Sequence, residues 1–395
     1  MKPFKAGLYV HFPFCRRKCP YCHFASAPVD VRVLRSRIAE WREGIAAEAG
    51  IFAAGLTGET GADGLEFETL YLGGGTPSLM TAEEIARLRE SLAGRLPLRP
   101  VEFTLEVHPS AHADDEIFRG WIRAGVTRLS VGAQSFDDDV LRVLGREATA
   151  AQTEDFVRRA REAGFAALGL DLMIGVPGES GRSLDRSLEA VRRIAPDHVS
   201  VYFLENVQGL PFEEYLKAHP VDEDAAVDAF ERAAAVLTSL GRRRYEISNF
   251  ARPRRECLHN LKYWRYEPFL GLGPSAASHL GAKRWTNVAD LDKWREGAAA
   301  GIVPAAETVN LDRETAAREA LAAGLRLVEG IDLDSFAGRF GFDPAERFRP
   351  EIAGLESNGM IVLSGRFLRI PENKLLVSNS ILSRLLNSGT HHLTP

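Results

Sequence analysis

Three cysteines close to the N-terminus have the spacing of an iron–sulfur site. Cys15, Cys19 and Cys22 stand four and three residues apart, directly after a short apolar run. Three thiolates in one tight loop can each bind one iron of a 4Fe-4S cubane, which leaves the fourth iron without a protein ligand. The amino and carboxylate groups of S-adenosylmethionine can chelate such an iron, and an electron from the cluster can then cleave the sulfonium to a radical.

Two other interpretations of these thiols remain open at this point. A zinc site would need a fourth ligand, for which His23 is the nearby candidate, although zinc knuckles prefer two separated cysteine pairs or cysteine with histidine. Three incidental thiols are the other interpretation. The chain has only four cysteines in all, and in a reducing compartment three of them within eight residues favour metal or redox chemistry over disulfides.

A glycine-rich turn follows the second apolar run. Gly73, Gly74 and Gly75 precede Thr76 there, and consecutive glycines let the backbone approach a ligand closely. A plain strand-to-helix turn also uses glycines. Because this turn is expected at the same sheet edge as the cysteines, we predict that Gly74, Gly75 and Thr76 help to hold the amino group of adenosylmethionine.

Polar residues also stand where further strands are expected to end. Glu106 closes the third strand, Gln134 lies just past the fourth, Asp171 is near the end of the fifth and Tyr202 near the end of the sixth. Carboxyl ends of parallel strands share one edge, the face that carries active sites in β/α barrels. Arg146 follows further along and could pair with the methionine carboxylate through its planar fork, or it is a cation on a surface helix.

The elements that must position these groups alternate regularly between residues 5 and 204. The runs that have strand character are Ala6–Phe12, Phe67–Leu72, Val101–Val107, Thr127–Val131, Ala167–Met173 and His198–Leu204. Amphipathic stretches separate them, such as Ala82–Leu92, opened by Thr81 and Glu84 in a capping-box spacing, and Thr153–Ala163, closed by Gly164. Six β/α units predict an α/β fold with a partial (β/α)6 barrel; a flat doubly wound sheet is the alternative.

The character of the sequence changes after the barrel. We expect residues 1–240 to form the barrel, with a helix at Ala225–Leu240, and 241–310 to extend it. Residues 311–395 should form a smaller winged-helix-like α+β domain. Its predicted elements are helices Arg313–Val328, Leu333–Phe340 and Pro350–Asn358, a hairpin Met360–Ile370 turning at Ser364–Gly365, and a last helix Lys374–Leu386.

Composition excludes several classes of function. The 395 residues are 45% hydrophobic and 26% charged, with a formal net charge of -5, so no general basic field indicates a nucleic-acid partner. Residues 331–395 hold seven acidic and seven basic side chains, so the winged-helix-like region gains no electrostatic support for DNA binding. The start lacks a signal-peptide pattern, and no run is long enough to span a membrane. We therefore expect a cytoplasmic protein.

Taken together, the motifs resemble a known family. They are the cysteine loop with the preceding Tyr-Val-His-Phe-Pro-Phe, the Gly-Gly-Gly-Thr-Pro turn, and the segments 132–136, 170–178, 245–251 and 271–274. This set is similar to the coproporphyrinogen-dehydrogenase-like radical S-adenosylmethionine family, over about residues 6–290. The resemblance implies a radical SAM barrel with a 4Fe-4S cluster on the three cysteines. It also implies an adenosylmethionine site formed by Gly74, Gly75, Thr76, Glu106, Gln134, Arg146 and Asp171, with Tyr9 and Tyr21 packing nearby.

Two branches of that family differ in a way that the sequence distinguishes. The oxygen-independent dehydrogenases carry a fourth cysteine two residues after the third, where this chain has Phe24. The heme-chaperone branch, HemW, lacks that cysteine and carries a His-Asn-x-x-Tyr-Trp motif, which His259 to Trp264 match in full. The resemblance therefore implies heme as a third bound group, an acceptor protein for it, of which a respiratory cytochrome is one candidate, and an electron donor for the cluster.

The 259–264 segment has physical features that suit heme. The imidazole of His259 could be an axial ligand, and Tyr263 and Trp264 offer aromatic faces to a macrocycle. Nearby cations could attract its propionates: Arg242, Arg243, Arg244, Arg252, Arg254 and Arg255. The alternative is a core histidine beside a solvated basic face. The chain departs from the family pattern at His23, at His108, around Glu147–Ala148, and at Ala277, where the family often has a histidine; His279 follows two residues later.

Three functions follow from these features. The first is a chaperone that binds heme and passes it to an acceptor. The second is oxidative decarboxylation of coproporphyrinogen III, and the third is radical chemistry on another tetrapyrrole. Phe24 and the complete 259–264 motif favour the chaperone, and the sequence leaves open whether adenosylmethionine is turned over.

Overall fold

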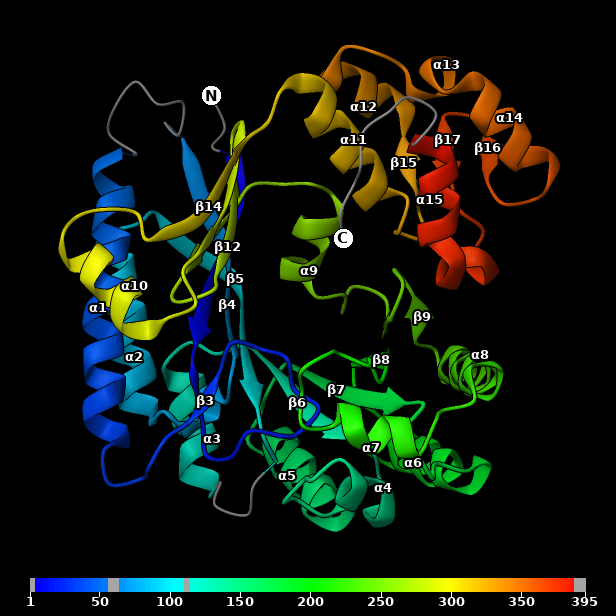
Figure 1. The fold of residues 1–395 in the computed structure, drawn as a ribbon. Coiled ribbons are helices and arrows are strands. Elements are labelled where there is room, and N and C mark those ends of the chain that lie inside the picture. The colour runs from blue at the N-terminus through cyan, green and yellow to red at the C-terminus, as the bar shows by residue number, and fades with distance from the viewer. Residues whose placement is uncertain (1–3, 56–63, 110–113, 387–395) are drawn as a thin grey trace.

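The computed structural model describes residues 4–55, 64–109 and 114–386. One large curved sheet runs through the molecule, helices cover its outer side, and a small helical domain stands beside one end of it (Figure 1). Within the described residues, no helix combines the length and the apolar character needed to cross a membrane.

Six parallel strands form the central part of the sheet, and all six were predicted from the sequence. Their apolar residues alternate with polar ones, as strands require when one face packs on helices and the other faces an interior. Their order in space follows their order in the chain. They are β1 (Phe4–Phe12), β4 (Leu65–Gly74), β5 (Leu98–Val107), β6 (Arg128–Gln134), β7 (Ala167–Ile174) and β8 (His198–Phe203).

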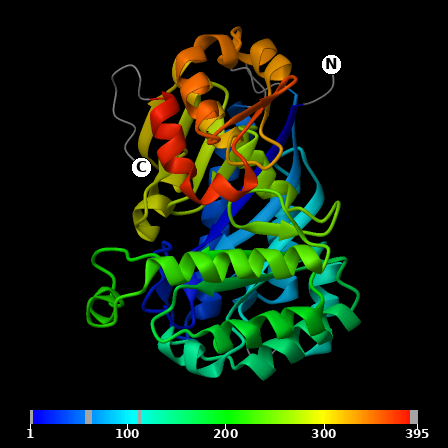
Figure 2. The same cartoon turned by 90° about the vertical axis from the view of Figure 1, so that its right-hand side faces the viewer.

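Helices follow these strands and cover the outer face (Figure 2). The capping box predicted for α2 is present, because the Thr81 hydroxyl accepts from the Glu84 N–H and the Glu84 carboxylate accepts from the Thr81 N–H. A second box, Thr149 with Gln152, starts α5 three residues before the predicted start. The helices are α1 (Leu34–Gly55), α2 (Ala82–Ala93), α3 (Asp115–Arg123), α4 (Asp138–Val143), α5 (Ala150–Glu162), α6 (Gly181–Ile194), α7 (Glu213–Ala218) and α8 (Glu223–Ser239), with a 3-10 turn η1 (Pro77–Leu79).

The sheet is wider than the sequence predicted. Six short strands extend it to twelve, and they were missed because each has only two to six residues. Four continue it beyond β1 and two beyond β8: β11 (Phe269–Leu272), β12 (Ala277–Leu280), β13 (Lys283–Asn287) and β14 (Ala305–Asn310), then β10 (Asn249–Ala251) and β9 (Arg243–Arg244). The sequential strand order with helices on the outer side identifies a partial barrel and excludes a doubly wound sheet, whose strand order reverses in the middle.

A buried acid holds the extension to the barrel. Glu48 of α1 accepts hydrogen bonds from the Gly273 N–H at 2.8 Å, the Asn287 amide at 2.6 Å and the Trp294 indole of α10 (Leu291–Ala299) at 2.9 Å. Gly273 has φ +104°, and a side chain there would meet the His11 carbonyl oxygen at 2.6 Å. Gly273, which directly follows β11, therefore starts a tight, glycine-dependent turn toward β12.

The C-terminal part has its own core, formed by apolar residues between Ala317 and Leu386. Its three-stranded sheet contains the predicted hairpin, as β16 (Val362–Ser364) and β17 (Phe367–Arg369), with β15 (Ile331–Asp332) added. The first predicted helix ends four residues early, at Gly324, and the last one begins as a 3-10 turn. The helices are α11 (Arg313–Gly324), α12 (Leu333–Phe340), α13 (Pro344–Arg347), α14 (Arg349–Ser357), η2 (Glu372–Val377) and α15 (Ser378–Leu386).

Candidate cluster and ligand site

The cysteine loop is closed by a small sheet of its own. β2 (Phe14–Cys15) pairs with β3 (Ala27–Pro28), so the chain leaves the barrel, makes the loop and returns to the same place. The Lys18 ammonium donates to the carbonyls of Phe24 and Ser26 at 3.0 Å each, and this holds the loop from inside. Cys15, Cys19 and Cys22 all line one cavity of about 360 Å³ at the carboxyl edge of the sheet, here called the chamber.

The donor set of this loop fits a cubane. The thiolates of a cubane bind different irons, so they need to share a cavity without meeting at one centre. Cys15, Cys19 and Cys22 share one cavity in this way. Among the described residues, no three His, Cys, Asp or Glu side chains form a group that could hold a single metal ion.

The glycine turn is shaped by its protein neighbours. A side chain at Gly74, which has φ +109°, would meet the His11 ring at 2.6 Å, and one at Gly75 would meet the Phe14 carbonyl oxygen at 2.5 Å. The N–H groups of Gly75 and Thr76 donate to Phe12 and Phe14, and that of Gly74 donates to Glu106. A ligand ammonium group needs acceptors, which the carbonyl oxygens of this turn can supply.

Two half-buried carboxyls, on β5 and β7, line the chamber. Glu106 accepts from the Tyr71 hydroxyl at 2.8 Å and from the Gly74 N–H at 2.9 Å. Burial raises its pKa to about 7, against the lowering effect of these two bonds. Burial also raises the pKa of Asp171, which accepts from the Ser130 hydroxyl at 3.2 Å. A cationic ligand beside both carboxyls would favour their ionised forms.

Arg146 lies at the mouth of the chamber, between the cluster loop and β6. Its guanidinium is 3.8 Å from the Cys19 sulfur and donates to the Gly132 carbonyl. Its Nε is buried and has no hydrogen-bond partner among the described residues, which leaves a donor for a ligand. Gln134 ends β6 with φ +65°, a conformation that a residue with a side chain adopts only under local constraint.

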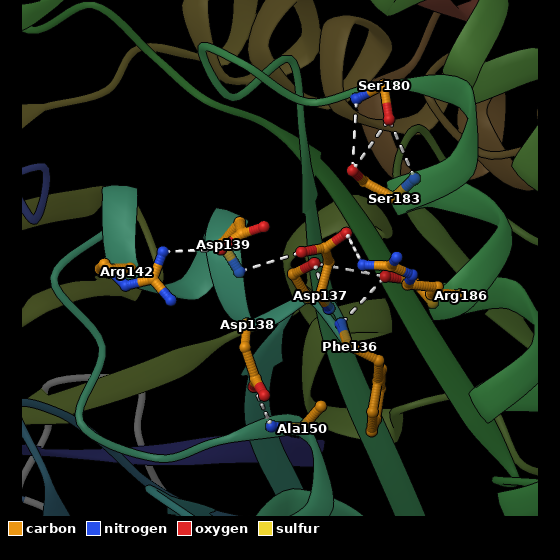
Figure 3. A network of polar contacts seen from close by, with 11 residues as sticks. Phe136, Asp137, Asp138, Asp139, Arg142, Ala150, Ser180, Ser183 and Arg186 are labelled. Carbon is orange, nitrogen blue, oxygen red and sulfur yellow. Dashed lines mark hydrogen bonds and ion pairs between the residues drawn. The ribbon is translucent and has the colours of Figure 1, made fainter.

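A polar network braces the loop that carries Arg146 (Figure 3). Asp137 accepts from the Asp139 N–H and from the Arg186 guanidinium of α6, both at 2.9 Å. Asp138 accepts from the Ala150 N–H at 2.8 Å, which ties the start of α4 to the start of α5. The segment between these helices, residues 144–149, is therefore fixed at both ends.

The remaining predicted residues divide between the wall and the rear of the chamber. Tyr21 and Tyr202 line it, whereas Tyr9 is not in its lining. The Tyr9 hydroxyl bonds to His11 Nδ1 at 2.9 Å, and its ring packs against those of Tyr71 and His259. Tyr9 thus packs behind the side chains that line the chamber.

The chamber has a polar floor that the sequence analysis missed. Buried groups there include Arg128, which donates to the Arg255 carbonyl at 3.0 Å, and His198, whose Nε2 bonds to the Tyr245 hydroxyl at 2.9 Å. A signal for them was available, because every second residue of β6 is polar or glycine while the residues between are apolar. The further floor residues are Thr104, Ser130, Ser200, Cys257 and Asn260.

The His-Asn-x-x-Tyr-Trp motif forms α9 (Leu258–Trp264), which packs on the concave face of the sheet. Glu102 of β5 caps this helix from outside it, since its carboxylate accepts from the N–H groups of Leu258 at 3.1 Å and His259 at 3.0 Å. Gly7 of β1 lets the helix approach, because a side chain there would meet the His259 ring at 3.1 Å.

His259 itself is enclosed by protein. It is 1% exposed, its Nδ1 bonds to the Thr69 hydroxyl at 2.8 Å and its Nε2 bonds to the Tyr263 hydroxyl at 2.8 Å. Burial lowers its pKa to about 3, and Lys262 lowers it further. To ligate a heme iron, as the sequence analysis expected, it would have to give up one of these bonds.

The six arginines near the motif do not form one basic face. Arg242 is buried and donates to the Pro196 carbonyl, and Arg244 is buried and donates to the carbonyls of Glu246 and Ile247. The guanidinium groups of these two arginines are therefore hydrogen-bonded to backbone carbonyl oxygens at the edge of the sheet. The expectation that all six attract propionates is wrong for Arg242 and Arg244.

Comparisons with known proteins agree with this architecture. A model of the Radical SAM superfamily matches residues 9–191, and a model of the HemN C-terminal domain matches residues 311–377. The fold is that of a solved structure, the coproporphyrinogen III oxidase HemN from Escherichia coli, with a TM-score of 0.83 at 21% identity over 97% of this chain and 90% of that one. The barrel, its three-cysteine loop and the appended domain thus define a radical SAM superfamily protein with a HemN-type C-terminal domain.

Relatives that align with nearly the whole chain show which family within the superfamily it belongs to. A protein of Mycobacterium tuberculosis named heme chaperone HemW is 32% identical over 385 residues, which are 96% of this chain and 94% of that protein. A bovine protein named radical S-adenosyl methionine domain-containing protein 1, mitochondrial, is 31% identical over 405 residues, 97% of this chain and 88% of that protein. The chain belongs to the HemW family, as its motifs predicted.

Proposed function

We propose that this protein is a heme chaperone, which binds heme and transfers it to an acceptor protein. Membership of the HemW family supports this proposal. The feature of this chain that supports the proposal best is position 24, where the dehydrogenase branch has its fourth cysteine. Phe24 stands there, 53% exposed on the rim of the chamber, and the remaining cysteine, Cys257, is buried in the chamber floor.

We also propose that the chamber holds a 4Fe-4S cluster on Cys15, Cys19 and Cys22 with adenosylmethionine beside it. When bound, the pair would supply reductive cleavage of the sulfonium. The residues of the chain would bind and orient the ligand: Arg146 through its free Nε–H toward a carboxylate, Glu106 and Asp171 toward cationic groups, and Gln134 at the rim. Gly74, Gly75 and Thr76 would accept the ammonium group, and Tyr9 and Tyr21 would support this arrangement.

The proposal includes the remaining partners. An electron donor must reduce the cluster, and the heme acceptor is a protein, with a respiratory cytochrome as one candidate. Three free thiols in one loop, one buried and two half-buried, need a reducing environment, which supports a cytoplasmic location.

One experiment separates the chaperone from the enzyme of the same fold. The full chain is reconstituted anaerobically with iron and sulfide, titrated with heme, and separately incubated with coproporphyrinogen III, adenosylmethionine and a strong reductant. We expect a Soret band from bound heme at equimolar ratio and no protoporphyrinogen. Formation of protoporphyrinogen would assign the chain to the dehydrogenases, and failure to bind heme would remove the chaperone function.

A further inference from the structure

The cluster loop concentrates positive charge on a protein of negative net charge. Arg16, Arg17 and Lys18 stand together between the first two cysteines, and no acidic residue occurs from position 6 to position 29. The whole chain, in contrast, has a formal net charge of -5. The loop lies just beyond the end of β1 in Figure 1, at the mouth of the chamber. A partner that approaches this mouth therefore meets a local charge opposite to that of the molecule as a whole.

One of these cations holds the loop, and the other two are open to solvent. The Lys18 ammonium donates to the carbonyls of Phe24 and Ser26, so it is used within the loop. Arg16 and Arg17 are exposed, and neither forms an ion pair with any of the described residues. Their charges are thus available to carboxylates of another molecule.

A small hollow beside the chamber brings these two arginines close to a cluster thiolate. Its volume is about 50 Å³, and both Arg16 and Arg17 line it, with Glu147 as its one acid among the described residues. Cys19 lines the hollow and the chamber alike. A group seated over the hollow therefore comes close to the Cys19 sulfur without entering the chamber.

An exposed aromatic pair lies on the same loop. Phe24 is 53% exposed on the rim of the chamber, and its ring centroid lies 5.1 Å from that of His23, which is also exposed. Protein interfaces combine apolar contact with a polar rim, and they are enriched in aromatic residues and arginine. We call the surface formed by Arg16, Arg17, His23 and Phe24 the docking face.

The cluster proposed above needs an electron from outside the protein. In the proposed arrangement adenosylmethionine occupies the chamber beside the open iron, so a donor has to approach the cluster from the loop. Electron-transfer complexes between proteins are small, with less than about 1,200 Å² buried, and complementary charge steers their formation. An acidic carrier is the partner that matches a basic docking face.

We propose that the docking face binds a small acidic protein that carries one electron, and that the electron enters beside Cys19. The proposal rests on the proposed cluster site, and it names the kind of donor that reduces the cluster and the place where it docks. Arg16 and Arg17 pair with carboxylates of the carrier, and Phe24 packs against it. In the transfer the carrier loses one electron and the cluster gains it, and no proton or group moves.

Reduction of the full reconstituted chain by a plant-type ferredoxin of acidic net charge tests the docking face. Reduced ferredoxin should bleach the cluster absorbance of the wild type. The rate should fall as salt rises to about 1 M, where the Debye length is about 3 Å. Arg16→Glu combined with Arg17→Glu should slow the reduction at least about tenfold at low salt, because electrostatic steering is lost. The same change should weaken the binding of oxidised ferredoxin in calorimetry.

Two control variants and a small reductant complete the design. Arg16→Lys combined with Arg17→Lys keeps both charges and should stay near the wild-type rate. Arg192→Glu combined with Arg193→Glu makes the same charge reversal at the end of α6, which returns from β7 to the opposite edge of the sheet, and should have no effect. Dithionite needs no docking, so it should reduce the cluster of every variant to the same extent and with the same midpoint potential.

Each other outcome overturns a defined part of the proposal. A wild-type rate in the Arg16 and Arg17 reversal, an equal loss in the α6 control, or a wild type that only dithionite reduces overturns the docking face and leaves the cluster standing. A shifted midpoint potential in the reversal also overturns it, because the arginines would then act on the cluster and not on a partner.

Two further results separate this proposal from the functions on which it rests. Loss of heme transfer in the Arg16 and Arg17 reversal, with unchanged reduction by ferredoxin, would assign the face to the heme acceptor instead. A wild type that assembles no cluster, or whose cluster dithionite does not reduce, overturns the cluster site and the docking face together.

Discussion

The chamber and a second cavity, which has a volume of about 260 Å³ and is here called the groove, occupy the same concave face, and α9 separates them. Asn260 of that helix lines the chamber, and Tyr263, one turn later, lines the groove. The chamber takes its carboxylates and its arginine from the ends of parallel strands and the loops after them, which the topology brings to one edge. The groove takes its rings from α9, the segment that follows it and the short strands β11 to β13, and its one lining residue from the C-terminal domain is Glu319. The chamber gathers two carboxylates and an arginine, which suit a charged cofactor, whereas the second cavity combines aromatic rings with charged side chains.

Removal of a cluster thiolate should have the largest effect, because it should remove the cluster from the chamber. Cys15→Ser, Cys19→Ser and Cys22→Ser should each abolish the broad absorbance of the reconstituted cluster, because each thiolate binds a different iron. Cys257→Ser should retain it, although Cys257 lines the same chamber. Iron content and absorbance check this. Loss of the cluster in Cys257→Ser together with its retention in Cys22→Ser would contradict the assignment.

The helix α9, which separates the two cavities, can be destabilised by changing Glu102. This carboxylate caps α9 and lies 3.9 Å from buried Arg128, so Glu102→Ala leaves a buried cation and two helix N–H groups without their acceptor. We expect the free energy of unfolding to fall by about 3–5 kcal/mol. Glu102→Gln keeps one acceptor oxygen, so its free energy of unfolding should fall by less. Denaturant unfolding measures the loss, and hydrogen exchange at Leu258 and His259 should rise first; unchanged exchange there would refute the capping role.

The turn that carries β12 toward the groove should make stability depend on pH. Burial raises the pKa of Glu48 to about 7, against the lowering effect of its hydrogen bonds from Gly273, Trp294 and Asn287. The folded state therefore holds a proton that the unfolded state has lost above about pH 4.5. Its contribution, on the order of 3 kcal/mol, is present below pH 4.5 and is lost as the pH rises through 7.

Glu48→Gln should flatten this dependence. Unfolding midpoints of the wild type and the variant between pH 5 and 8 measure the difference. The matched control is Glu43→Gln on the same helix. Parallel pH profiles for wild type and Glu48→Gln would exclude Glu48 as the titrating group.

The smallest effect is expected at the mouth of the chamber. Arg146→Ala should weaken adenosylmethionine binding by about 1.5–3 kcal/mol, roughly tenfold or more, because a charge-assisted hydrogen bond is lost. Arg142→Ala, which removes a nearby exposed arginine paired with Asp139 on its own helix, is the control and should bind normally. Calorimetry on the reconstituted protein gives both affinities. An adenosylmethionine affinity that stays at the wild-type value in both Arg146→Ala and Glu106→Ala would count against the proposed site.

Much of the barrel could be predicted from the sequence for a physical reason. Six apolar runs with helical patterns between them allow few other arrangements, and the right-handed β/α connection puts all the strand ends at one edge. Glu106, Asp171 and the cysteine loop could therefore be grouped before any coordinates were known. The alternation of polar residues along β6, from Arg128 to Gln134, was also present in the sequence and would have indicated the chamber floor.

Local sequence alone determined the cluster loop, the capping boxes and the C-terminal hairpin, because each depends on residues within about ten positions of one another. Tertiary structure decided the rest. Both ring nitrogens of His259 are engaged because Thr69, 190 residues away, reaches one of them. His279, in the groove, has a buried ring nitrogen without a partner among the described residues because β12 pairs with β11 in one particular register, and Tyr266 covers it because α11 and α12 hold that side chain. No local pattern encodes which buried imidazole is left without a partner, since that depends on every neighbour that the fold supplies.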